Sequence, residues 1–124
     1  MYQRLGASMM MLERYEDAVK YLDEAEKLEL ELPGNAYYRG VSLLALKRYD
    51  EAAADFGTSI EEGFLTQFCY YNRGVCYVQL LDYEKAAQDM ERTLTSGEDP
   101  ELIEAAREIL LQIEEYNENI TEMP

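Results

Sequence analysis

The sequence predicts an all-α protein: an α–α superhelix, or α-solenoid, of three helix–turn–helix repeats and a closing helix. The first observation is that LERYEDAVKYL, LKRYDEAAADF and LLDYEKAAQDM follow one another at intervals of 34 residues, starting at Leu12, Leu46 and Leu80. The second is that alignment at this interval brings identical residues into three columns: Gly6, Gly40 and Gly74; Tyr15, Tyr49 and Tyr83; Ala18, Ala52 and Ala86. Self-similarity at such a period is typical of stacked repeats, in which each unit buries its apolar face against its neighbours.

The first helix of each repeat carries a glycine in its middle. The expected helices include NAYYRGVSLLAL at 35–46 and FCYYNRGVCYVQL at 68–80, after a first helix within residues 1–12. Glycine inside a helix costs about 1 kcal/mol relative to alanine. Its recurrence therefore predicts a close approach of a neighbouring helix at each glycine.

The second helix of each repeat is expected to start after a short turn at Arg14, Arg48 or Asp82. Its apolar residues follow the three-and-four spacing of an amphipathic helix, as at Tyr49, Ala52, Ala53, Phe56 and Ile60. Turn-rich breaks end the repeats at 31–35, 61–64 and 96–100.

A closing helix is expected from about Pro100 to Tyr116, with Asp99 as its N-cap. It is in frame with the first helices, but Glu108 occupies the glycine position. This replacement indicates a capping helix on which no second helix packs. Residues from Asn117 onward are expected to fray.

One domain follows, divided into repeats at 1–32, 33–66 and 67–98, a capping helix at 99–118 and a tail at 119–124. The first repeat begins within its first helix, and no polar capping residues precede that helix in the sequence. We therefore expect either a longer parent protein or a partner stacked on the N-terminal face.

Residues 1 to about 98 resemble the tetratricopeptide repeat family. The residues that carry the resemblance are Tyr2, Leu5, Gly6, Tyr15, Ala18, Leu22 and Ala25; Gly40, Tyr49, Ala52 and Phe56; and Gly74, Tyr77, Tyr83, Ala86 and Met90. Arg39 and Arg73 depart from the pattern, because they replace the leucine before the glycine. The resemblance implies that the first helices line a concave groove and the second helices form the convex back.

The charge is segregated along the chain. Its 26 acidic and 11 basic residues give a net charge of −15, which argues against a nucleic-acid partner. Yet residues 1–12, 33–48 and 65–81 contain no Asp or Glu. The expected groove is therefore neutral to mildly basic, and the acidic back keeps the protein soluble.

The resemblance places a partner-binding groove on the first helices. The positions it projects are Arg4, Tyr37, Tyr38, Val41, Leu44, Tyr71, Asn72, Val75 and Val78, with Gln3, Ala7, Met10, Met11, Phe68 and Gln79 beside them. Tyrosine and methionine are common at binding surfaces because they bury a large area against varied partners. We expect the rings of Tyr38 and Tyr71 to face outward, and Arg39 or Arg73 to meet an acidic residue of the ligand.

Catalysis and cofactor binding have little support. The chain contains no histidine, no glycine-rich phosphate loop and no nucleophile motif. We expect no enzyme activity, no cofactor and no metal. Cys69 and Cys76 are expected to be buried small hydrophobes, and the chain has no apolar run of the length that a membrane span needs.

Two functions remain in competition. The first is a scaffold or adaptor that binds a protein or peptide segment in the groove. The alternative is a structural module that self-associates, or packs on the rest of a larger protein, through an N-terminal face that includes Tyr2 and Leu5. Exposed groove aromatics in a monomer favour the first, and a covered N-terminal face favours the second.

Overall fold

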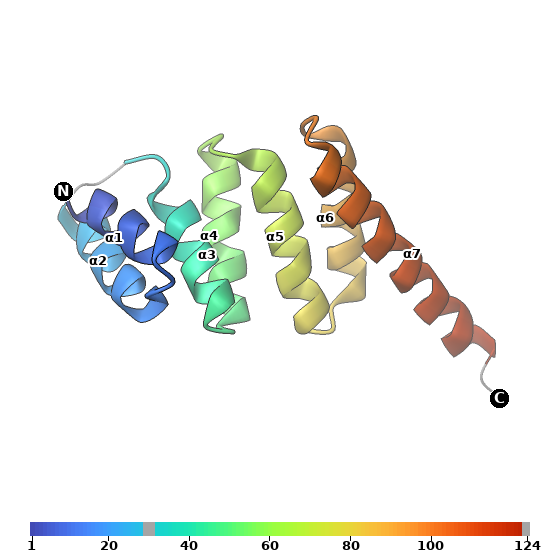
Figure 1. Cartoon of the computed structure of the whole chain (residues 1–124). Helices are drawn as coiled ribbons and strands as arrows, with labels where there is room; N and C mark the ends of the chain where they lie inside the picture. The colour runs from blue at the N-terminus through green and yellow to red at the C-terminus, as the bar shows by residue number, and fades with distance from the viewer. Residues whose placement is uncertain (29–31, 123–124) are drawn as a thin grey trace.

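The structure is a computed structural model that describes residues 1–28 and 32–122. Within these ranges the chain forms seven α-helices and no strand, which confirms the predicted all-α solenoid. The helices are α1 (Tyr2–Met11), α2 (Tyr15–Leu28), α3 (Asn35–Ala45), α4 (Tyr49–Glu61), α5 (Thr66–Gln79), α6 (Tyr83–Thr95) and α7 (Pro100–Glu122). They follow one another across the molecule in chain order, from α1 and α2 at one end to α7 at the other (Figure 1).

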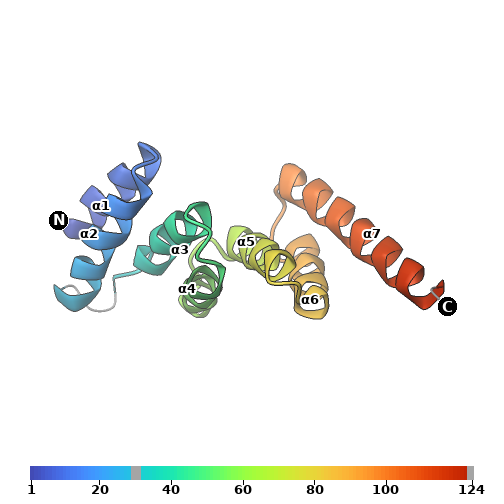
Figure 2. The ribbon, with the colours of Figure 1, turned by 90° about the horizontal axis from the view of Figure 1, so that it is seen from below.

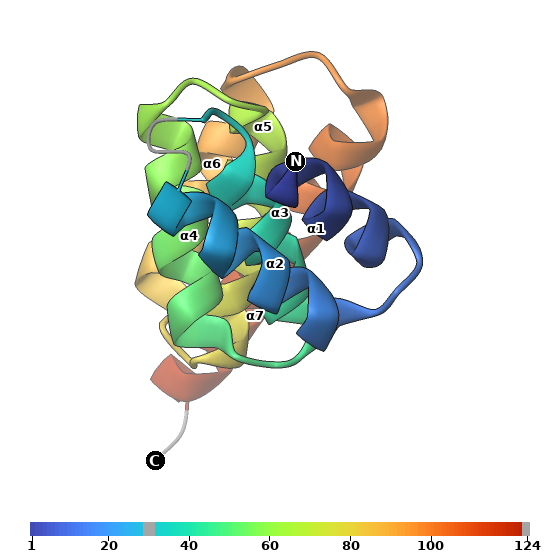
Figure 3. The same ribbon diagram turned by 90° about the vertical axis from the view of Figure 1, so that its left-hand side faces the viewer.

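Each helix packs mainly on its neighbours in the sequence. The pairs α1–α2, α3–α4 and α5–α6 have the most extensive contacts, and α2, α4 and α6 each continue the stack onto the following helix. Seen from below, the three pairs and α7 stand in a row (Figure 2). The view from the N-terminal side shows α1 and α2 in front of the later pairs (Figure 3). Contacts also join α1 to α3 and α3 to α5, so the first helices lie next to one another.

The recurring glycines lie where the two helices of a pair come closest, as predicted. A Cβ added at Gly40 would lie 3.0 Å from the nearest ring carbon of Phe56 on α4. At Gly74 the nearest atom would be the terminal methyl of Met90 on α6, at 2.7 Å. Only a residue without a side chain allows this approach, which offsets the low helix propensity of glycine.

The core repeats with the sequence. Leu22, Phe56 and Met90 occupy the same position of the three second helices, and each is 0% exposed. Cys69 and Cys76 on α5 are also fully buried, and both are free thiols, as predicted.

The turn between the helices of each pair uses the same backbone conformation three times. Glu13, Lys47 and Leu81 lie 34 residues apart and have φ angles of 61°, 62° and 63°. This left-handed conformation ends the first helix and reverses the chain, and it is one that residues other than glycine adopt at a cost. The second helices then start at Tyr15, Tyr49 and Tyr83, as the sequence predicts.

Two side chains fix the start of α7. Asp99 Oδ1 accepts hydrogen bonds from the backbone N–H groups of Glu101 and Leu102, at 3.0 and 3.3 Å, which confirms the predicted N-cap. Gln67 of α5 donates to the carbonyl of Thr93 and accepts from the N–H of Asp99. This buried amide therefore ties the α6–α7 connection to α5.

The C-terminal end differs from the prediction. Helix α7 does not end near Tyr116 but continues to Glu122, so residues 119–122 of the expected tail are helical. No glycine or proline interrupts 101–122, and Ile120 continues the spacing of Ile113 and Tyr116. Residues 123–124, and residue 31 of the first predicted break, lie outside the described ranges.

Candidate protein-binding surfaces

The predicted groove residues of α3 pack partly against the hydrophobic core. Tyr37, Val41 and Leu44 are half-buried and pack against the core cluster around Phe56. The ring of Tyr37 lies edge-on to Phe56, with centroids 6.3 Å apart, and burial raises the pKa of its hydroxyl.

Tyr38 also differs from the prediction of an outward-facing ring. Its centroid lies 5.7 Å from that of Tyr37 and 6.0 Å from that of Phe64, in the α4–α5 connection. The two tyrosines and Phe64 thus form an aromatic cluster that links α3 to the start of the next pair. The sequence could not show this, because Phe64 lies in a turn outside both helical patterns.

The predicted residues of α5 remain accessible. Tyr71, Asn72, Val75 and Val78, which we call the α5 row, are half-buried and share one face of the helix at spacings of one, four and seven residues. Among the residues that the structure describes, neither the Tyr71 hydroxyl nor the Asn72 amide makes a hydrogen bond. Arg4, on α1, is exposed.

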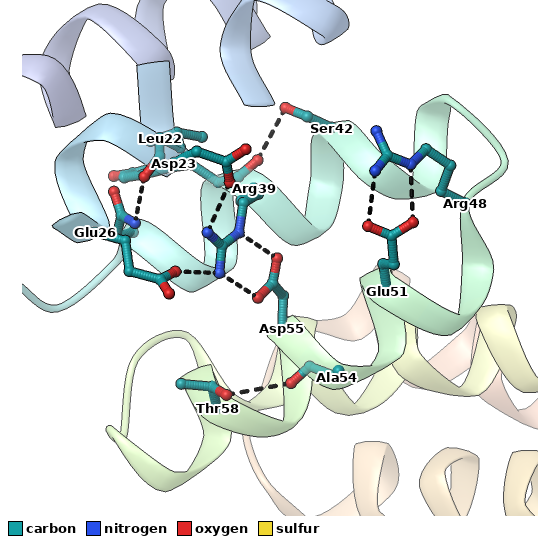
Figure 4. Close-up of polar contacts among 12 residues, drawn as sticks. Leu22, Asp23, Glu26, Arg39, Ser42, Arg48, Glu51, Ala54, Asp55 and Thr58 are labelled. Atoms are coloured by element: carbon teal, nitrogen blue, oxygen red, sulfur yellow. Dashed lines mark hydrogen bonds and ion pairs between the residues drawn. The ribbon is translucent and has the colours of Figure 1, made fainter. Parts of the chain in front are cut away.

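Arg39 is not a free groove cation. It donates from Nε and Nη2 to the two carboxylate oxygens of Asp55, at 2.8 and 2.9 Å. It also pairs with Asp23, at 3.0 Å, and with Glu26, both on α2 (Figure 4). Arg39 therefore links α3 to α4 within its own repeat and to α2 of the preceding one.

Arg73 has the same role one repeat later, but with a single carboxylate partner among the described residues; its guanidinium also lies over the rings of Tyr70 and Tyr77. Its Nε and Nη2 donate to Asp89 on α6 at 2.9 and 2.8 Å. The positions that correspond to Asp23 and Glu26 are here Gly57 and Ile60. The expectation that Arg39 or Arg73 meets an acidic ligand residue is therefore wrong, because each arginine is already held by a carboxylate 16 residues further on.

The ion pairs stabilise the charged, protonated form of each arginine. Hydrogen bonds from Arg39 to Asp55, and from Arg73 to Asp89, raise the pKa of each guanidinium above its usual range. Burial raises the pKa of Asp55, an effect that the hydrogen bonds from Arg39 oppose. Bidentate geometry of this kind gives strong, directional ion pairs, and here each one joins the two helices of a pair.

A cleft of about 200 Å³ opens between α5, α6 and α7. We call it the α7 cleft; it is lined by Val78, Tyr83, Ile109, Gln112, Ile113 and Tyr116. Two of these residues, Tyr83 and Tyr116, contact each other with ring centroids 4.7 Å apart in an edge-on arrangement. Val78 thus belongs both to the α5 row and to this cleft.

The sequence prediction of a plain capping helix does not include the α7 cleft. The spacing of Ile109, Ile113, Tyr116 and Ile120 was a usable indication, since these residues fall on one side of a helix. What the sequence could not indicate is the tilt of α7, whose C-terminal part stands away from the other helices (Figure 1).

A wider hollow of about 530 Å³ lies between α2 and the connection from α3 to α4. Most of its lining is charged, and it includes Lys20, Asp23 and Arg48. Several of these groups are paired with one another or with neighbours, such as Arg48 with Glu51 at 2.7 Å. This hollow offers ionic contacts, and Val19 and Leu46 add apolar surface to its lining.

The fold and these surfaces define a helical-repeat solenoid. Within 1–28 and 32–122, no helix has the length and apolar character to cross a bilayer, and no group of His, Cys, Asp and Glu side chains is arranged to hold a metal ion. The chain matches no protein-family model and no curated protein sequence.

Proposed function

We propose that this protein is a scaffold or adaptor module of the tetratricopeptide-repeat type, which binds a peptide segment of another protein on the face formed by its first helices. The observation that carries the proposal is the α5 row. A tyrosine hydroxyl and an asparagine amide stand there beside two valines, half-exposed and without hydrogen-bond partners among the described residues. The row lies in an acid-free stretch of an otherwise strongly acidic chain.

These residue types suit peptide recognition. Tyrosine buries a large apolar area and offers a hydroxyl, and an asparagine amide both donates to and accepts from a peptide backbone. The aromatic cluster of α3 lies on a helix that directly contacts α5, which carries the row. A bound segment would then rest on α5 and be held by a few side chains of one face.

The test uses peptides selected on the intact chain from a phage-displayed random library. The double variant Tyr71→Ala/Asn72→Ala is expected to bind them about ten- to a hundredfold more weakly in fluorescence anisotropy, as for loss of an aromatic anchor. The matched control is Glu84→Ala/Gln88→Ala on the exposed side of α6, which should bind normally. Circular dichroism establishes that both variants are folded. Equal affinity of the two variants would exclude the α5 row as the binding site.

Self-association through the N-terminal face is a second candidate, and it rests on one comparison. Leu12 on the outer pair is 65% exposed, whereas Leu46, which occupies the same position one repeat later, packs against the core. Leu5 occupies in the first repeat the position that Arg39 occupies in the second, and Arg39 there contacts Asp23 of the preceding helix. Sedimentation over a concentration series tests this candidate: a dimer that Leu12→Glu abolishes would support it, and a monomer at every concentration would exclude it.

A further inference from the structure

The α7 cleft has the size and lining of an anchor site for a side chain. Its volume of about 200 Å³ is below the roughly 300 Å³ at which small-molecule pockets begin. Four of its six lining residues are Val78, Ile109, Ile113 and the ring of Tyr116, which present mainly apolar surface, and Gln112 adds one amide at the rim. Such a cleft fits one large aliphatic or aromatic side chain.

Apolar surface continues beyond the cleft. Helix α7 has 23 residues and α6 has 13, or about 35 and 20 Å of helix. The last turns of α7 therefore extend past α6, as Figure 2 shows. At the edge of the cleft Tyr116 is 45% exposed, and on the extension Ile120 is 47% exposed; Leu81, two residues before Tyr83, is 73% exposed. A ligand anchored in the cleft would find further apolar contacts along α7.

The charge beside the cleft defines the ligand. Helix α7 contains seven glutamates and one arginine, and none of these eight groups forms an ion pair within the described part of the chain. Elsewhere some exposed charges pair locally, as Arg14 does with Asp17 and Arg48 with Glu51, but no other helix carries as many unpaired carboxylates in the described part of the chain. The negative charge of α7 is therefore left available for a partner.

Four of the glutamates form a glutamate stripe along α7. Glu101, Glu108, Glu115 and Glu122 are seven residues apart, so they project from nearly the same side of the helix. Glu108 and Glu115 lie four residues before and three residues after Gln112, which makes them neighbours of the cleft rim. The stripe and the apolar cleft thus run side by side.

We propose that the α7 cleft and the glutamate stripe together bind a basic amphipathic segment of another protein. One large apolar side chain of that segment fills the cleft, and its Lys or Arg residues lie against Glu108 and Glu115. A second copy of this chain is a poor occupant, because two molecules of charge −15 repel each other, most strongly at this acidic helix. The inference rests on the proposed function and specifies the partner of the same module, since Val78 joins the cleft to the α5 row.

The test uses two fluorescein-labelled amphipathic helical peptides, one made of leucine and lysine and the other of leucine and glutamate. The intact chain is expected to bind the lysine peptide in fluorescence anisotropy, less tightly as salt is added, and not to bind the glutamate peptide. Glu108→Gln/Glu115→Gln should weaken binding about three- to tenfold, as for two exposed ion pairs. Glu114→Gln/Glu118→Gln, which makes the same change of net charge on the far side of α7, should change it less than twofold.

Occupation of the cleft is tested with Gln112→Trp, an exposed position where a large side chain blocks the cleft without replacing a core residue. This variant should lose lysine-peptide binding while its circular dichroism is unchanged. No binding of the lysine peptide by the intact chain, equal effects of the two glutamate pairs, or full binding by Gln112→Trp would each overturn the proposal. A dimer in sedimentation that Gln112→Trp dissociates would also overturn it, because a second copy would then fill the cleft.

The same assays separate this inference from the proposed function. If library-selected peptides depend on Tyr71 and Asn72 but not on Glu108, Gln112 and Glu115, the module binds peptides and the α7 proposal is wrong. If those peptides depend instead on Glu108, Gln112 and Glu115 but not on Tyr71 and Asn72, the α7 proposal holds and the α5 row is not the site.

Discussion

Removal of the Arg73 side chain should destabilise the third repeat strongly. Asp89 has only 6% of its side chain exposed, and Arg73 supplies both hydrogen bonds to its carboxylate. Arg73→Ala leaves this carboxylate buried and unpaired, which costs about 3–5 kcal/mol at a buried site. Because Arg73 itself is 25% exposed and water can replace it in part, we expect the lower end of that range, about 3 kcal/mol.

This loss can be expressed as a melting temperature. The entropy of unfolding is about 2.1 cal/mol/K per residue, so 3 kcal/mol corresponds to a decrease of ~12 °C for a chain of this length. Urea unfolding monitored by circular dichroism gives the free energy of unfolding directly. The slope of this free energy against urea concentration should be the same as in the unmodified protein if the unfolded state is unaffected.

Two further variants isolate the cause. Asp89→Ala should cost less than Arg73→Ala, about 1–2 kcal/mol, because the longer arginine can turn toward water. Arg73→Leu/Asp89→Tyr copies Leu5 and Tyr21, which hold these positions in the first repeat, and should recover most of the loss. If Arg73→Ala costs less than about 1 kcal/mol, or no more than Asp89→Ala, the unpaired carboxylate is not the source of the destabilisation.

Three other perturbations have defined outcomes. Gly40→Ala should lower the free energy of unfolding in urea by about 1–2 kcal/mol, because the new methyl presses on the fully buried ring of Phe56; a stabilised variant would contradict the close-packing explanation. Leu81→Gly should raise the melting temperature by removing a left-handed backbone cost of about 1 kcal/mol, and a decrease would show that the turn is not strained. Burial raises the pKa of the Cys76 thiol to about 12; the unfolded chain then releases this proton at lower pH than the folded one, so stability should fall above about pH 8.5, by at most ~1.4 kcal/mol per pH unit. Cys76→Ala should remove that part of the pH dependence between pH 8 and 10, and an identical pH profile would refute the assignment.

The repeat frame was predictable because it depends on local sequence. The glycines, the second-helix starts and the cap at Asp99 follow from spacing and residue type, and the structure confirms them. The ion pairs were not predictable in this way. Arg39 and Asp55 are 16 residues apart on different helices, and only the angle between those helices brings them within 2.8 Å.

The binding surface was predictable only in part. The α5 row is half-buried and remains a predicted binding surface, whereas Tyr37 and Tyr38 of α3 contact Phe64, a residue of an irregular turn. The α7 cleft depends on the direction in which α7 leaves the stack. That direction is set by Gln67 and the α6–α7 connection, through contacts between residues about 30 positions apart.

Glu108 also sets a limit on assembly. A glycine at this position would let a further helix approach α7 closely, as α4 and α6 approach Gly40 and Gly74. With Glu108 and Arg107 exposed there instead, the side of α7 that carries these two charged residues does not offer an apolar surface on which the N-terminal face of another molecule could stack. Head-to-tail growth into a filament through that side of α7 is therefore disfavoured. Association through the N-terminal faces would join two molecules about a twofold axis and close the assembly at a dimer.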